Sequence, residues 1–217
     1  MGNRWTDKKD GWTWDPRKAY IKEAVKNSLK RLQTDYIDLY QLHGGTIEDQ
    51  IEETIEAFEE LKEEGYIRYY GISSIRPNVI RKYVRKSNIV SVMLQYSILD
   101  RRPEEEILSL LHKNGISVVT RGSLAKGLLS KMALEKASQS VKENGYLDYR
   151  YDELEQLLPS LQERFSGRSL TEVAYQYVLS HPAVTSIVAG ASSVEQLKEN
   201  IQFIQSATKA NKYTNHR

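Results

Sequence analysis

The segment Tyr36-Ile37-Asp38-Leu39-Tyr40-Gln41-Leu42-His43 decides the fold class of this chain. It is rich in aromatic and branched residues, which is typical of a β-strand, and His43 closes it. Upstream, four apolar residues recur at helical spacing: Ile21, Val25, Leu29 and Leu32. Asp15-Pro16 precedes them as a predicted N-cap and first helical residue. The sequence therefore predicts a helix from residue 15 to 32 followed by a strand from 36 to 42.

The same alternation of helix and strand continues to the end of the chain. Further helices are predicted over residues 47–61, 77–86, 103–112, 152–164, 170–180 and 194–204. Further strands are predicted over residues 67–72, 89–95, 116–120 and 186–189. This pattern indicates a parallel sheet covered by helices, either an open doubly wound sheet or a (β/α) barrel. No G-x-G-x-x-G or phosphate-loop sequence occurs, which favours the barrel.

Length and composition predict one compact domain over residues 1–217. The chain has 217 residues, of which 40% are hydrophobic, enough to bury a core. Residues 131–149 interrupt the rhythm with polar sequence and are predicted to be a loop insert or a short helical one. Residues 207–217 form a polar tail, predicted to be frayed.

Charge and cysteine content exclude several classes of function. The formal net charge is only +2, and both signs are scattered along the helices, so neither a nucleic acid nor a membrane is an expected partner. With 0 cysteines, no disulfide, thiolate metal site or thiol nucleophile is possible. The polar residues 1–5 do not resemble a signal peptide, and we expect a cytoplasmic protein.

Three segments together resemble the aldo-keto reductase family. They are Asp35-Tyr36-Ile37-Asp38-Leu39-Tyr40-Gln41-Leu42-His43, Gly65-Tyr66-Ile67-Arg68-Tyr69-Tyr70-Gly71-Ile72-Ser73-Ser74, and Val188-Ala189-Gly190-Ala191-Ser192-Ser193-Val194-Glu195-Gln196-Leu197-Lys198-Glu199-Asn200. Their order and separation also match the family. The resemblance implies an α/β fold of the (β/α)8 TIM barrel type and reduction of an aldehyde or ketone by hydride transfer from NADPH, with NADH as the alternative cofactor.

The resemblance also implies roles for individual residues. His43 matches the histidine that orients the substrate carbonyl, and a neutral imidazole N–H is suited to polarising that oxygen. The plainer alternative is a histidine that merely ends a strand. Ser73 and Ser74 match the pair that holds the nicotinamide carboxamide, although the second position is usually asparagine. Met93 stands where many members have a glutamine, and we interpret it as core filler with Gln95 as a neighbouring polar group.

The remaining expected cofactor contacts lie in two later segments. Arg121, Gly122, Ser123, Leu124 and Lys126 match the family's loop near the nicotinamide and phosphates, with Arg121 stacking or meeting the pyrophosphate. Gly190, Ser192, Ser193, Gln196 and Asn200 match the adenosine end, although Gln196 replaces an arginine that many members place on the 2′-phosphate. Two alternatives stay open: Lys126 as a solvated surface lysine, and Ser192 and Ser193 as simple helix caps.

The resemblance begins downstream of the family's catalytic aspartate, tyrosine and lysine, none of which has a match in residues 1–217. We therefore expect an N-terminally truncated chain and an incomplete barrel that lacks roughly three β/α units, since the fold typically takes ~250 residues. Exposed sheet edges in such a barrel favour self-association. The alternative function is a non-catalytic NADP(H)-binding module or an inactive fragment. A metal hydrolase is a distant third reading, because His43, His112, His181 and His216 are scattered.

Overall fold

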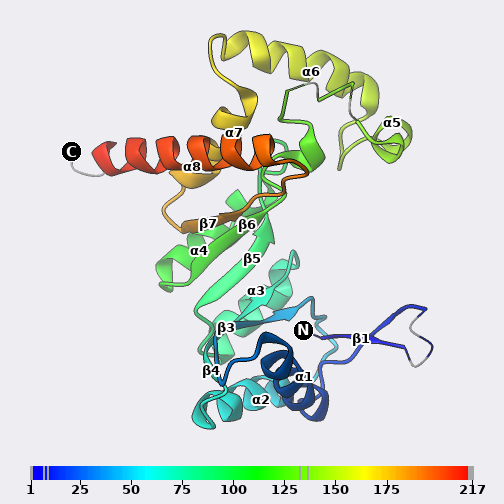
Figure 1. The fold of residues 1–217 in the computed structure, drawn as a ribbon, viewed down its shortest axis with the longest axis vertical. Helices are drawn as coiled ribbons and strands as arrows, with labels where there is room; N and C mark the ends of the chain where they lie inside the picture. Colours follow the sequence, from blue (N-terminus) through cyan, green and yellow to red (C-terminus); the bar gives the residue numbers. More distant parts are fainter. Residues whose placement is uncertain (1, 7, 9, 132, 136, 215–217) are drawn as a thin grey trace. The chain divides into compact units, whose positions relative to one another are not determined.

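A computed structural model describes residues 2–6, 8, 10–131, 133–135 and 137–214 (Figure 1). Its strands are β1 (Asn3–Trp5), β2 (Trp12–Trp14), β3 (Ile37–His43), β4 (Ile67–Ser73), β5 (Ser91–Gln95), β6 (Ser117–Arg121) and β7 (Val184–Val188). Its α-helices are α1 (Lys18–Leu32), α2 (Ile51–Glu63), α3 (Pro77–Lys86), α4 (Ile107–Lys113), α5 (Gln139–Asn144), α6 (Tyr151–Arg164), α7 (Leu170–Ser180) and α8 (Val194–Thr214). Two short 3-10 helices cover Arg102–Glu104 and Ala125–Gly127.

The predicted α/β class is confirmed. Strands β3 to β7 form one sheet in their order along the chain, and the pairs β3–β4 and β4–β5 are parallel. Helices separate the successive strands, as the alternating hydrophobic patterns indicated. No helix among the described residues is long and apolar enough to cross a membrane.

Predicted and observed boundaries of the strands differ by one or two residues, and the largest differences are at four helices. Helix α1 begins at Lys18 rather than at residue 15, because Asp15 accepts hydrogen bonds from Arg17 and lies outside the helix. Ile47, predicted to begin the second helix, is exposed and precedes α2. The helix predicted over residues 103–112 is a 3-10 turn followed by the shorter α4. Helix α8 runs to Thr214, past the predicted end at residue 204, so the expected frayed tail is helical up to that residue.

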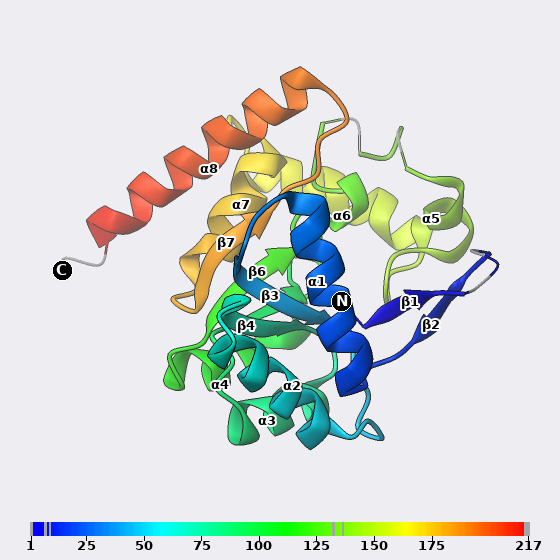
Figure 2. The ribbon, with the colours of Figure 1, turned by 60° about the horizontal axis from the view of Figure 1, so that its bottom comes forward.

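The chain divides into two compact units, each with its own buried residues. One domain over residues 1–217 remains a prediction. The first unit contains the described residues up to Leu94 together with Ser109–Val118. In it, α1 and α2 lie side by side (Figures 1 and 2). Phe58 of α2 is fully buried and its ring stacks on Tyr70 of β4 with centroids 5.0 Å apart. This contact holds α2 against β4.

The second unit contains Gln95–Leu108 and the described residues from Val119 onward. Helices α7 and α8 pack together in it. Its buried cluster joins the loop after β6 to α5, α6 and α7 and consists of Leu99, Ala125, Leu128, Leu129, Val141, Tyr146, Leu154, Leu158 and Ala174. Val141 and Tyr146 belong to the predicted insert 131–149, which therefore contains the short helix α5 and contributes to this core.

Strands β1 and β2 form a β-hairpin that the sequence patterns did not predict. Strands β1 and β2 pair antiparallel, with Trp5 opposite Trp12 and Asn3 opposite Trp14. Each strand has 3 residues, too few for a periodicity to be recognised in the sequence.

Candidate functional site

His43 lies at the carboxyl end of β3 in a row with predicted site residues of the two neighbouring strands. His43 pairs in register with Ser73 of β4, and Ser73 pairs with Met93 of β5. The backbone N–H of Gly44 donates to the carbonyl of Ser73 at 2.8 Å and closes the end of this ladder. Because parallel strands end at the same edge of a sheet, three positions at least 20 residues apart in sequence become neighbours there.

Ser74 is held by the fold on both its backbone and side chain. Its backbone N–H donates to the carbonyl of Met93 at 3.0 Å, and its Oγ accepts from the N–H of Arg76 at 3.2 Å. The residue is buried, whereas His43 is exposed and Ser73 is half-buried. His43 is therefore the member of this group that solvent or a ligand reaches most readily.

A second group of predicted residues lines a cavity of about 520 Å³ in the second unit. Seven of the residues expected to contact the cofactor line it: Gly122, Ser123, Leu124, Lys126, Gly190, Gln196 and Asn200. They come from the loop after β6, from the segment that joins β7 to α8, and from the first two turns of α8. The tertiary structure thus brings two predicted segments about 70 residues apart into one cavity.

Buried hydrogen bonds hold the wall of this cavity at α8. Asn200 Nδ2 donates to the carbonyl of Gly190 at 3.1 Å, and its Oδ1 accepts from the Tyr175 hydroxyl at 2.8 Å. Burial, with a smaller contribution from Glu199, raises the pKa of Tyr175 to about 12. The hydroxyl therefore keeps its proton at neutral pH and donates it in the hydrogen bond to Asn200. These two hydrogen bonds through Asn200 connect α7, α8 and the loop that contains Gly190.

Ser192 and Ser193 do not line the cavity, and their side chains bond within the first turn of α8. Ser193 Oγ accepts from the N–H of Gln196 at 3.2 Å, while Ser192 Oγ donates to Gln196 Oε1 at 3.0 Å. For Ser193 this is the helix-capping role considered from the sequence. The start of α8, beside the cavity, is a region of positive partial charge.

Arg121 also lies outside the cavity lining, and its side chain belongs to a hydrogen-bond relay. Arg121 Nη1 donates to Gln95 Oε1 at 2.9 Å, and Gln95 Nε2 donates to the buried carboxylate of Asp100 at 2.9 Å. Gln95 Nε2 also lies 3.3 Å from the Tyr146 hydroxyl. Gln95 is therefore a polar residue that positions Arg121, while Met93 lies next to Ser73.

Cavity residues that the sequence analysis missed include Lys131, Thr171, Tyr175 and Glu199. Thr171 and Tyr175 belong to the buried face of α7, and helical periodicity identifies such residues only as core. Lys131 begins the polar segment 131–149, in which no motif was recognised. Among the described residues, no group of three or more histidine, aspartate or glutamate side chains is placed to hold a metal ion.

Comparison with known proteins shows the family of this chain. The sequence model of the Aldo/keto reductase family matches residues 3–215. The chain belongs to the aldo/keto reductase family. It is 60% identical to an uncharacterized oxidoreductase, YqkF, of Bacillus subtilis, an alignment that covers 100% of this chain and 74% of that protein. It is 34% identical to the NADH-specific methylglyoxal reductase of Escherichia coli over 83% of this chain and 58% of that protein.

Solved structures of this family share the fold. The holo form of aldo-keto reductase AKR11C1 from Bacillus halodurans superposes with a TM-score of 0.85 at 61% identity, over 94% of this chain and 65% of that chain. The chain thus spans about two thirds of the length of that reductase. Aldo/keto reductases are oxidoreductases, and the comparisons give no support to the alternative of a non-catalytic module.

Proposed function

We propose that this protein takes part in the NADPH-dependent reduction of an aldehyde or ketone. The cavity lined by seven residues that the family resemblance assigns to the cofactor supports this proposal most directly. When bound, NADPH supplies the hydride. The relative named as a methylglyoxal reductase supports a small carbonyl compound as the substrate class.

His43 acts on the substrate. At the end of β3 its exposed imidazole donates a hydrogen bond to the carbonyl oxygen and holds that oxygen as negative charge develops on it. Pairing of β3 with β4 keeps the backbone of His43 beside Ser73, so the imidazole starts from a fixed position.

The cavity residues fit a phosphate-bearing cofactor. Gly122 has a φ of +66°, which places the 122–124 backbone in a tight turn open to close approach. Lys126 and Lys131 supply positive charge at the same cavity, and the N-terminus of α8 adds a partial one. Ser73 and Ser74 are proposed to hold the nicotinamide amide, and Arg121, Ser192 and Ser193 to contact the cofactor beside the cavity.

The choice between NADPH and NADH depends on residues near Gln196. Gln196 carries no charge, and its Oε1 is already engaged by Ser192. We propose NADPH, with Lys126 or Lys131 meeting the 2′-phosphate, and NADH as the alternative; the Escherichia coli relative is named as NADH-specific.

Fluorescence titration of the purified chain with NADPH tests the proposal, beside circular dichroism and an assay of hexanal reduction. We expect saturable binding and turnover, with NADH binding at least tenfold more weakly. Binding without turnover would show the non-catalytic module instead. A folded chain that binds neither cofactor would contradict the proposal altogether.

Replacing Asn200 with alanine is expected to weaken NADPH binding about tenfold. The substitution leaves the Tyr175 hydroxyl and the Gly190 carbonyl without their partner, which costs about 1–3 kcal/mol of folding free energy and releases the Gly190 loop. Gln202→Ala, an exposed change on the same helix, is the control. Equal affinities in the two variants would show that Asn200 does not shape the site.

Three further properties are expected from the sequence and from membership of the family. The (β/α)8 barrel, a cytoplasmic location and self-association stay predictions. Among the described strands, β3 and β7 end the sheet order and each has a free edge available for pairing. Sedimentation analysis of the purified chain measures the last of these directly.

A further inference from the structure

All 3 tryptophans of the chain lie in strands β1 and β2, at positions 5, 12 and 14. Trp5 and Trp12 are cross-strand partners whose ring centroids are 3.5 Å apart with planes tilted by 30°. Both are unusually exposed for tryptophan, at 52% and 56%. Two large apolar rings therefore form a continuous surface of which about half is exposed.

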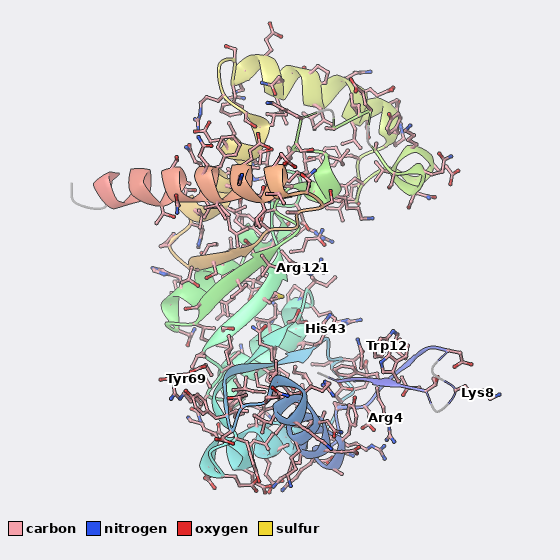
Figure 3. The ribbon with its side chains drawn as sticks, in the orientation of Figure 1. Arg4, Lys8, Trp12, His43, Tyr69 and Arg121 are labelled. Carbon is pink, nitrogen blue, oxygen red and sulfur yellow. The ribbon has the colours of Figure 1, made fainter. Side chains whose placement is uncertain are left out.

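The hairpin has two different faces. On one face, Arg4 lies over the ring of Tyr20 at 5.5 Å and pairs with Asp15 at 3.6 Å, which attaches this face to α1. Trp5 and Trp12 alternate with Arg4 and Thr13 along their strands, so the tryptophans point to the opposite face. Figure 3 shows Trp12 and Arg4 on opposite sides of the hairpin, with His43 on the side of Trp12.

Trp14 connects this face to the end of β3. Its indole Nε1 donates to Asp49 at 3.0 Å, and its ring lies so close to Gly44 that an added Cβ there would be 3.4 Å from it. Gly44 directly follows His43. Trp12 and Trp14 are two residues apart on the same face of β2, roughly 7 Å along a strand. An aromatic track thus runs from beside His43 to the exposed Trp5–Trp12 pair.

We propose that the Trp5–Trp12 pair binds the apolar chain or ring of the substrate, whose carbonyl group is held at His43. This inference rests on the proposed carbonyl reduction and adds the substrate class, carbonyl compounds with an apolar substituent of several carbons. Neither tryptophan ring carries a charge, and the basic Arg4 is held on the other face, so apolar contact is the interaction that this surface offers. The continuity of the track with His43 selects the substrate as the occupant.

Tryptophan emission reports on this site alone, because no tryptophan lies elsewhere in the chain. The experiment titrates the full chain with straight-chain primary alcohols from 1-propanol to 1-heptanol, the products of aldehyde reduction, which do not react with lysine. A fully buried methylene raises affinity about fourfold, and contact with one face of a ring pair should give about half of that free energy. We expect the Kd of the unaltered chain to fall about twofold for each added methylene.

Three variants determine where that dependence on chain length arises. In the double variant Trp5→Ala, Trp12→Ala, Trp14 remains as the reporter, and the affinity should change less than twofold over the whole alcohol series. The variant Trp5→Phe, Trp12→Phe keeps both aromatic faces and should keep most of the dependence. Lys8→Ala, at the exposed tip of the hairpin, should match the unaltered chain.

Equal slopes in the unaltered chain and the alanine double variant would overturn the assignment, provided that circular dichroism shows both to be folded. Absence of alcohol binding by the unaltered chain would overturn it as well. The NADPH titration uses the cavity of the second unit and is independent of these tryptophans, so failure of the proposed function is distinguished from failure of this inference.

Discussion

Replacing His43 with alanine should lower kcat/KM for aldehyde reduction by about 10²–10³-fold, the loss typical of removing one hydrogen-bond donor to a developing oxyanion. His43 is exposed at the carboxyl end of β3 and is not part of the core, so its removal should leave the fold intact. The Kd for NADPH should stay within twofold, since the cavity residues belong to other strands and loops.

Two further variants separate the chemistry of His43 from nonspecific effects. His43→Asn keeps an N–H donor and should recover part of the rate. His112→Ala removes an exposed histidine of α4 and should change nothing. If steady-state kinetics showed the same rate for His43→Ala and His112→Ala, His43 would not act on the carbonyl.

Replacing Gly71 with alanine should reduce the free energy of unfolding by about 3 kcal/mol, at the upper end of what overpacking usually costs. A Cβ added at Gly71 would lie 2.4 Å from the backbone carbonyl oxygen of Ser91 and 2.9 Å from its Oγ. Gly71 and Ser91 are paired in the parallel ladder of β4 and β5, so the backbone itself must move. Thermal denaturation should show a fall in Tm of roughly 6–12 °C for a chain of this size.

Gly190→Ala is the matched control, because a Cβ at Gly190 meets nothing within 4 Å. Its Tm should stay near that of the unaltered chain. The Gly71 variant should also disturb the site, since Ser73 and Met93 follow two residues later along the same pair of strands. A Gly71→Ala protein with unchanged Tm would show that β4 and β5 separate more easily than the packing indicates.

The sequence was most informative where motifs coincide with strands and helix starts. The segment from Tyr36 to His43 predicted β3 and its terminal histidine, and the seven cavity residues were named from the family resemblance before any geometry was known. Boundaries were less accurate. Asp15 reads as a helix cap by residue type, but its carboxylate is taken by Arg17, and α1 begins three residues later.

The hairpin shows why other features could not be predicted. Trp5, Trp12 and Trp14 lie in strands of 3 residues, and their role depends on pairing with each other and on contacts with Gly44 and Asp49, 30 or more residues away. Local propensity contains no information on such contacts. The same applies to Tyr175. Helical periodicity identifies it as a core residue, and only its hydrogen bond to Asn200 connects it with the site.

The sequence alone determined the alternation of strands and helices, the family, and the types of side chain available for binding and catalysis, because hydrophobic periodicity and motifs are local properties of the chain. Only the tertiary structure decided which of these side chains lie together. It placed His43 beside Ser73, joined Gly122 and Asn200 in one cavity, and directed Arg121 to Gln95. The physical reason is that strand register and helix packing set the distances between residues remote in sequence, and both arise from burial of the core as a whole.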